Sequence, residues 1–89
     1  MKAVISVVGC DSVGIIAKVS NECADCGVNI LDISQTVLNE YFTMIMIVDI
    51  AKLTISFNEF VDRMAERGKS DNLDINVMHE DIFNSMHRI

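Results

Sequence analysis

The sequence predicts an α+β fold of the ferredoxin-like, split βαβ type, a sandwich in which a four-stranded antiparallel sheet carries two helices on one face. Three observations lead to this prediction. The chain has 89 residues, enough for one small domain. Two segments space their apolar residues as a helix does, and four others are apolar or alternate as strands do. These segments follow the order strand, helix, strand, strand, helix, strand, and a short C-terminal helix comes after them.

The first strand and helix are predicted from residue type and spacing. Lys2–Val8 is apolar and rich in β-branched residues, which favours a strand, and residues 9–13 form a turn. A helix then runs from Gly14, and Gly27 is placed to end it in a left-handed conformation. The buried face expected for this helix consists of Ile15, Ile16, Val19, Cys23 and Cys26.

A hairpin follows the first helix. Val28–Leu38 alternates between apolar and polar residues, as expected for a strand with one face of each kind. Residues 39–40 make the turn. Tyr41–Ile50 is apolar on both sides, so we expect it to be an interior strand of the sheet.

The second half repeats the helix–strand order. Residues 56–67 predict a helix, ended by Gly68, whose buried face holds Phe57, Phe60, Val61 and Met64. Leu73–His79 alternates as a last strand. We therefore divide the chain into a domain of residues 1–79 and a helical tail of residues 80–89, with Ile82, Phe83 and Met86 on one side of the tail.

Charge and composition exclude several classes of partner. The formal net charge is −6 and the seven basic residues form no run, which argues against binding to nucleic acid or to an anionic membrane. No segment is long enough to span a membrane, and the apolar start is too short for a secretion signal. Three cysteines, an odd number, indicate free thiols in a reducing compartment. We expect a cytoplasmic protein.

The glycine-bracketed turn of residues 9–14 matches neither a phosphate loop nor a metal site. A P-loop needs a lysine and a hydroxyl residue after its second glycine, where this chain has Ile15 and Ile16. Only Cys10 lies in the turn, whereas Cys23 and Cys26 lie at the far end of the helix, nearly 20 Å away. We predict no metal and no cofactor.

Catalytic groups do not gather in the sequence either. The two histidines, His79 and His87, lie in the last eleven residues and share no helix face, and nothing brings Cys10 to them. Cys23 and Cys26 continue the apolar stripe of the first helix, which is typical of buried core residues. We expect a protein that is not an enzyme.

Binding of a small molecule suits the turn better. The backbone N–H groups of residues 13–16 lie at the helix start, where they have no partner within the helix and can receive a carboxylate. Asp11 and Ser12 add an acceptor and a hydroxyl group. Backbone donors beside one carboxylate suit a zwitterion such as an amino acid. An ordinary strand–helix turn capped by Asp11 is the competing interpretation.

The segment "GCDSVGIIAKVSNECADCGVNILDISQTV", residues 9–37, resembles the signature of ACT domains. These small amino-acid-sensing modules carry a Gly-x-Asp-x-x-Gly-Ile turn, a helix, and Val-Asn-Ile at the second strand. The stretch "ILDISQTVLNEYFTMIMIVDI" and the ending "HEDIFNSMHRI" are similar to stand-alone bacterial and archaeal ACT-domain proteins without an assigned function. The resemblance implies a βαββαβ domain that regulates and does not catalyse.

The resemblance also implies a two-chain site. ACT domains usually pair side by side into an eight-stranded sheet, with their first helices in contact and the ligand at the interface. Carried over residue by residue, Asp11, Val13, Gly14 and Ile15 form the loop side of this site. Asn29 and Ile30, from the second copy, form the strand side. The expected partners are therefore a second copy, in a homodimer or higher oligomer, an amino-acid-like ligand, and a protein that the module regulates.

Two departures from the family pattern keep an alternative open. Many ACT domains have Arg-Pro where this chain has Ser12-Val13, so the turn lacks a rigid proline and a counter-charge for an anion. Most are also attached to the enzyme or transcription factor that they regulate. The alternative function is a protein-interaction or assembly module whose ligand pocket is vestigial. A thiol or metal function would need Cys10 of one copy near Cys23 or Cys26 of another.

Overall fold

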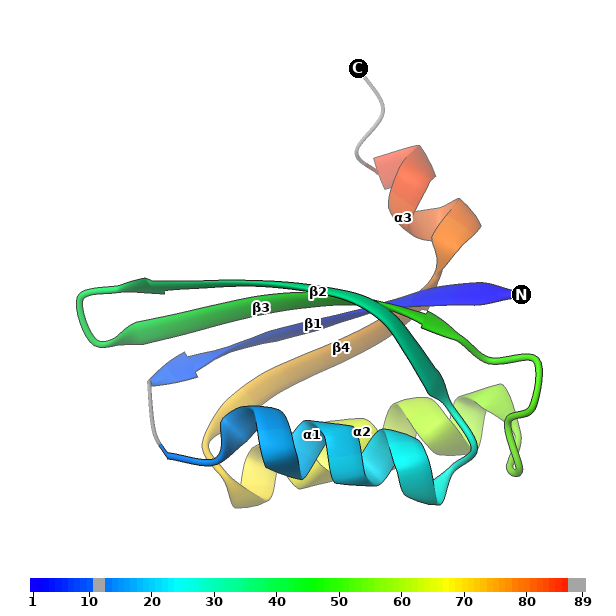
Figure 1. The fold of residues 1–89 in the computed structure, drawn as a ribbon, viewed down its shortest axis with the longest axis horizontal. Coiled ribbons are helices and arrows are strands. Elements are labelled where there is room, and N and C mark those ends of the chain that lie inside the picture. Colours follow the sequence, from blue (N-terminus) through cyan, green and yellow to red (C-terminus); the bar gives the residue numbers. More distant parts are fainter. Residues whose placement is uncertain (11–12, 87–89) are drawn as a thin grey trace.

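The computed structural model describes residues 1–10 and 13–86, which form one sheet, two helices beneath it and a third helix above it (Figure 1). The fold class predicted from the sequence is confirmed. The seven elements are β1 (Lys2–Cys10), α1 (Ile15–Asp25), β2 (Asn29–Leu38), β3 (Tyr41–Asp49), α2 (Phe57–Ser70), β4 (Leu73–His79) and α3 (Glu80–Met86).

The sheet is antiparallel throughout, in the order β2-β3-β1-β4. β1 and β3 are the interior strands, which explains why both segments are apolar on two faces. β3 was correctly predicted to be interior. The hairpin turn is also confirmed, with Asn39 at a positive φ of 57°. β1 extends two residues further than predicted, through Gly9 and Cys10, because both pair with the start of β3.

The core lies between the sheet and the two helices. Alternate residues of β1, β3 and β4 point into it, among them Ile5, Met44 and Met46, which are fully buried. α1 contributes Ile15, Val19 and Cys23, and α2 contributes Phe60 and Met64. The Ser56 side chain caps α2 by accepting a hydrogen bond from the Glu59 backbone N–H at 3.1 Å.

Two details predicted for the helices are wrong. Ile16 was expected on the buried face of α1, but it is 38% exposed. The buried stripe consists of Ile15, Val19 and Cys23, and Ile16 is rotated about 100° from Ile15 around the helix axis. Gly68 was expected to end α2, but the helix continues to Ser70. A Cβ atom at Gly68 would lie 2.5 Å from the Leu73 carbonyl oxygen, so glycine is needed there for the close approach of β4.

β2 alternates as predicted, yet its apolar residues are not covered. Leu31, Ile33 and Val37 are 47%, 38% and 52% exposed. A bulge between Ile30 and Asp32 shifts the pairing with β3, so that Ile33 and Val37 lie on the helix side while Leu31 has no partner residue. Because β2 is the edge strand and extends past α1, its outer half has no covering layer. The result is an apolar sheet edge open to solvent.

Candidate functional site

The start of α1 and the outer half of the β2–β3 hairpin enclose a groove of about 480 Å³. The hairpin supplies one wall and the first turn of the helix supplies the other. Its lining consists of Gly14, Ile15, Ile16, Ala17, Gln35, Val37 and Phe42. We call this the α1 groove.

The first turn of α1 lines the α1 groove with backbone N–H groups that have no acceptor among residues 1–10 and 13–86. Gly14 is the N-cap residue, with φ 85° and no side-chain hydrogen bond to the helix start. Its carbonyl oxygen accepts the first helical hydrogen bond, from the Lys18 N–H at 3.0 Å. The N–H groups of residues 15–17 therefore have no acceptor within the helix, and the first turn contains no acidic side chain. Such donors attract an anionic group.

The walls of the α1 groove are apolar apart from one amide. Ile15 and Phe42 are buried beneath it, and Val37 and Ile16 are partly exposed at its rim. Gln35 supplies an amide that can donate and accept hydrogen bonds. No charged side chain belongs to this lining, as far as the described residues show. The groove therefore suits a ligand with one carboxylate, which meets the helix start, and a neutral remainder.

The strand side of the predicted site lies at the other end of β2. Asn29 borders a second hollow of about 360 Å³, together with Gly27, Asp49, Ala51 and Lys52. Ile30 packs against the core. From Asn29 to Gln35 the strand rises about 20 Å, so Asn29 and the α1 groove of the same chain cannot hold one small ligand.

The loop side of the predicted site is placed in part. Gly14 and Ile15 line the α1 groove. Val13 is 97% exposed and is not part of the lining. Asp11 and Ser12 lie outside the described residues, so their predicted contribution stays a prediction, although the N-cap of α1 is Gly14 and not Asp11. Sequence reasoning missed Gln35, Val37 and Phe42. The only available signal was their spacing, which places Gln35 and Val37 on one face of the strand.

Cys23, Cys26 and His79 do not belong to the lining of the α1 groove. Cys23 and Cys26 are fully buried, and burial together with the neighbouring Cys26 and Glu22 raises the pKa of Cys23 to about 11. His79 stacks on Phe57 with ring centroids 4.2 Å apart. Among the described residues, no three His, Cys, Asp or Glu side chains are arranged to hold a metal ion. His87 is not among those residues.

A charged cluster on the underside joins the two helices. Arg63 Nε donates to Glu22 Oε2 at 2.7 Å, and Arg67 Nε lies 3.5 Å from the other oxygen of the same carboxylate. Lys18 Nζ reaches Asp71 Oδ1 at 3.2 Å. Each of these three cations lies within ion-pair distance of a carboxylate, so the cluster links α1 to α2, with a modest contribution to stability because most of it is solvent-accessible. Among the described residues, Arg67 Nε and Asp71 Oδ2 are buried without a hydrogen-bond partner.

Comparisons with known proteins agree with this architecture. A model of the ACT domain family matches residues 2–77. A UPF0237 protein of Clostridium acetobutylicum is 49% identical over 89 residues, covering 100% of both chains. A UPF0237 protein of Methanococcus maripaludis is 46% identical over 86 residues and covers 97% of this chain and 96% of its own. No helix within residues 1–10 and 13–86 is long and apolar enough to cross a membrane.

Solved structures give the same result. An ACT domain protein from Streptococcus pneumoniae has a TM-score of 0.82 and 44% identity, covering 98% of each chain. A formyltetrahydrofolate deformylase from Pseudomonas syringae pv. tomato matches 88% of this chain with 27% of its own, at a TM-score of 0.75 and 26% identity. The fold and the family match thus define a small ACT-type α+β domain. The chain belongs to the ACT domain family, and its full-length relatives are UPF0237 proteins.

Proposed function

We propose that the chain is a non-catalytic regulatory module that binds an amino acid, or a similar small zwitterion, at the interface of a homodimer. The observation that carries this proposal is the position of the α1 groove beside the uncovered edge strand β2. Among the described residues, the groove alone offers backbone donors for a carboxylate but no charged side chain for an ammonium, only the Gln35 amide. A second chain on the β2 edge would complete it.

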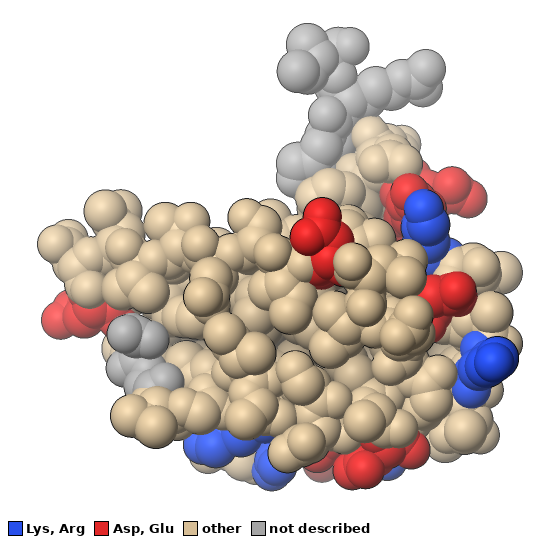
Figure 2. Space-filling view, in the orientation of Figure 1, with Lys and Arg blue, Asp and Glu red and all other residues tan. Residues whose placement is uncertain are grey.

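The β2 edge is suited to pairing with a copy of itself. An edge strand presents unpaired backbone N–H and C=O groups, which a second strand can satisfy. Leu31, Ile33 and Val37 add partly exposed apolar surface along it. In Figure 2, the middle of the side formed by β2 and α1 carries few charged side chains, and most of the visible acids and bases lie at its margins. Antiparallel β2–β2 pairing would therefore bury apolar surface without burying many charges.

Such pairing brings the two halves of the predicted site together. With a two-fold axis near the middle of β2, the Asn29 end of one strand lies opposite the Val37 end of the other. Asn29 of the second copy then approaches the α1 groove, where its amide oxygen can accept from the ligand's ammonium group. The helix start would hold the carboxylate, and Ile15, Val37 and Phe42 would surround the side chain.

Thermal-shift and calorimetric screening against the twenty common amino acids tests the proposal. We expect at least one of them to stabilise the protein. Asn29→Ala should weaken that effect, and Ala17→Glu should too, because it places an acid beside the ligand's carboxylate. Asn76→Ala, on the exposed side of β4, is the matched control and should bind normally. Failure of every amino acid to stabilise the wild-type protein would rule the proposal out.

A second candidate function, a protein-interaction or assembly module, is favoured by α3. This helix exposes Ile82 and Met86 by 53% and 65%, although both are apolar. In this case the division at residue 79 separates an ACT domain from a docking tail. Deleting residues 80–89 should reduce the number of copies in the assembly, measured by its mass in solution, or abolish capture of the regulated protein. A truncated dimer that still binds its amino acid would count against this second candidate.

A further inference from the structure

The α1 groove presents mainly apolar side chains to whatever enters it. Ile15 and Phe42 lie at its base and are only 3% and 4% exposed, so the protein itself already covers them. Val37 on β2 and Ile16 on the first turn of α1 remain 52% and 38% exposed. The apolar surface that a ligand in the groove could still remove from water therefore belongs to these two residues.

The register of the hairpin directs its lining residues toward α1. Gln35 pairs with Met44 and Val37 pairs with Phe42. Met44 and Phe42 are buried on the helix side of the sheet, and paired residues of neighbouring strands point to the same side. Gln35 and Val37 therefore face the helix layer, so that β2 contributes one amide and one isopropyl group to the groove.

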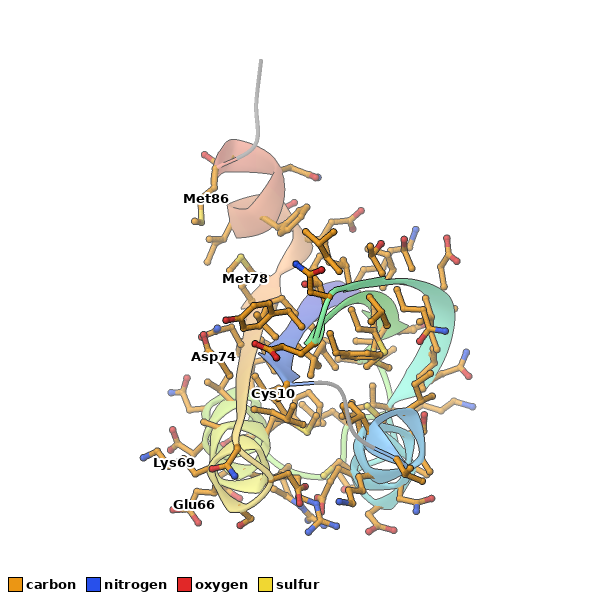
Figure 3. All side chains as sticks on the ribbon, turned by 90° about the vertical axis from the view of Figure 1, so that its left-hand side faces the viewer. Cys10, Glu66, Lys69, Asp74, Met78 and Met86 are labelled. Carbon is orange, nitrogen blue, oxygen red and sulfur yellow. The ribbon has the colours of Figure 1, made fainter. Side chains whose placement is uncertain are left out.

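The charged side chains closest to this lining in the sequence lie outside it. Lys18 follows the first turn of α1, but its Nζ lies 3.2 Å from Asp71 Oδ1, beyond the end of α2. Glu40 lies in the hairpin turn and does not line the groove. Figure 3 views the end of the molecule at which α1 begins, and three charged residues labelled there lie on the side of α2 and β4: Glu66, Lys69 and Asp74. A charged ligand side chain would therefore find no opposite charge among the described lining residues.

The polar group of the lining is needed for the part that all amino acids share. The ligand's ammonium group requires an acceptor, and Gln35 has the only described lining side chain that can accept a hydrogen bond. The backbone N–H groups at the start of α1 meet the carboxylate. Val37 and Ile16 are then left for the ligand's side chain, and both are apolar.

We propose that the α1 groove selects amino acids with an uncharged aliphatic side chain, which Val37 and Ile16 cover. This selectivity rests on the proposed function, because it assumes that the carboxylate of an amino acid meets the start of α1. Each methylene group that the groove removes from water should strengthen binding about fourfold. A charged side chain would lose its hydration there without gaining a partner, so it should bind more weakly.

Calorimetric titration of the wild-type protein with a series of amino acids tests this selectivity. Glycine, alanine, norvaline and norleucine carry side chains of increasing length, and we expect Kd to fall about fourfold for each added carbon until the groove is full. Two matched pairs test charge. Aspartate resembles leucine in shape, and lysine is norleucine with an added ammonium group. Each charged member should bind about tenfold or more weakly than its apolar counterpart.

A valine on each face of the sheet supplies the variant and its control. Val37→Thr puts a hydroxyl group into the groove at almost constant shape and should weaken leucine binding about fivefold, while glycine, which has no side chain, binds as before. Val8→Thr makes the same change at a residue that is 43% exposed but does not line the groove, so it should leave the whole series unchanged.

The outcomes separate this selectivity from the proposed function on which it rests. Binding of aspartate, lysine or serine more tightly than leucine would overturn the selectivity and leave the amino-acid site in place. Equal effects of Val37→Thr and Val8→Thr on leucine binding would overturn it too. Failure of every amino acid to bind the wild-type protein would overturn both.

Discussion

The two faces of the sheet differ in how their apolar residues are used. Met46 and Ile45 are neighbours on β3, but Met46 is fully buried beneath the helices, whereas Ile45 is 38% exposed on the opposite face of the sheet, which we call the open face. The helix side supplies the core of the monomer. The open face and the β2 edge, with comparable residue types, add little to that core and are available to other molecules. Variants on each face should therefore separate the stability of the monomer from the association that we propose.

Truncation on the helix side should have the largest effect. Met46→Ala removes a fully buried side chain and should lower the free energy of unfolding by about 3 kcal/mol, through lost transfer energy and the cavity left behind. Ile45→Ala, one residue away on the open face, should cost less than about 1 kcal/mol under dilute conditions where the chain is monomeric. Urea denaturation measures both. Equal losses would show that the open face belongs to the monomer's core.

The glycines at the two ends of α1 give the next comparison. Both have positive φ, 85° at Gly14 and 75° at Gly27. A Cβ atom at Gly14 meets no described residue within 4 Å, whereas one at Gly27 would clash with the Lys52 carbonyl oxygen. Gly14→Ala should cost about 1 kcal/mol for its backbone conformation alone, and Gly27→Ala should cost about 2 kcal/mol or more. Thermal unfolding of the two variants distinguishes these costs, and a smaller loss at Gly27 would contradict the described approach of residue 52.

Loss of the α2 cap should have a smaller effect. Ser56→Ala removes the acceptor for the Glu59 N–H and should lower stability by about 1 kcal/mol. Ser70→Ala, at the other end of α2, is the control, because the Ser70 hydroxyl only donates to the Glu66 carbonyl oxygen within an exposed turn. Chemical denaturation should rank Ser56→Ala as the more destabilising of the two.

Thiol reactivity compares the two faces without a mutation. Cys10 is exposed on the open face, whereas Cys23 and Cys26 are fully buried in the core. Burial raises the pKa of Cys23 to about 11, so its thiolate forms only as pH approaches that value, and its folded-state reaction at pH 8 should be slow. Alkylation followed by mass spectrometry should show one rapidly modified thiol per folded chain and three after denaturation. Rapid modification of Cys23 at pH 8 would contradict the described core.

The sequence predicted the order of elements because each has a clear period. Val28–Leu38 alternates every second residue, and the stripe of Ile15, Val19 and Cys23 repeats every four, so both periods are local properties. Gly68 was misinterpreted because a glycine near a helix end can mark a stop or a close approach. Only the position of the Leu73 carbonyl distinguishes these two roles.

Only the part of the candidate site that comes from the turn and the start of α1 could be predicted from the sequence. Gly14 and Ile15 follow from the turn and the helix start, which a short stretch of sequence encodes. Gln35, Val37 and Phe42 reach the same groove through the sheet order and the bulge after Ile30. Neither the strand order nor the bulge can be recognised from a short stretch of sequence. The hairpin residues that face the start of α1 could therefore not be predicted.

The central claim is that one binding site takes residues from two chains. Ala17→Glu damages the groove side and Asn29→Ala the strand side, so each variant alone should bind the amino acid selected by thermal-shift screening much more weakly than the wild-type protein. Co-expression with two different affinity tags isolates the mixed dimer, in which one site retains both intact halves. Calorimetry of that mixed dimer should recover binding, at about half the wild-type stoichiometry. A mixed dimer that binds no ligand, while the wild-type protein does, would contradict a site shared between two copies.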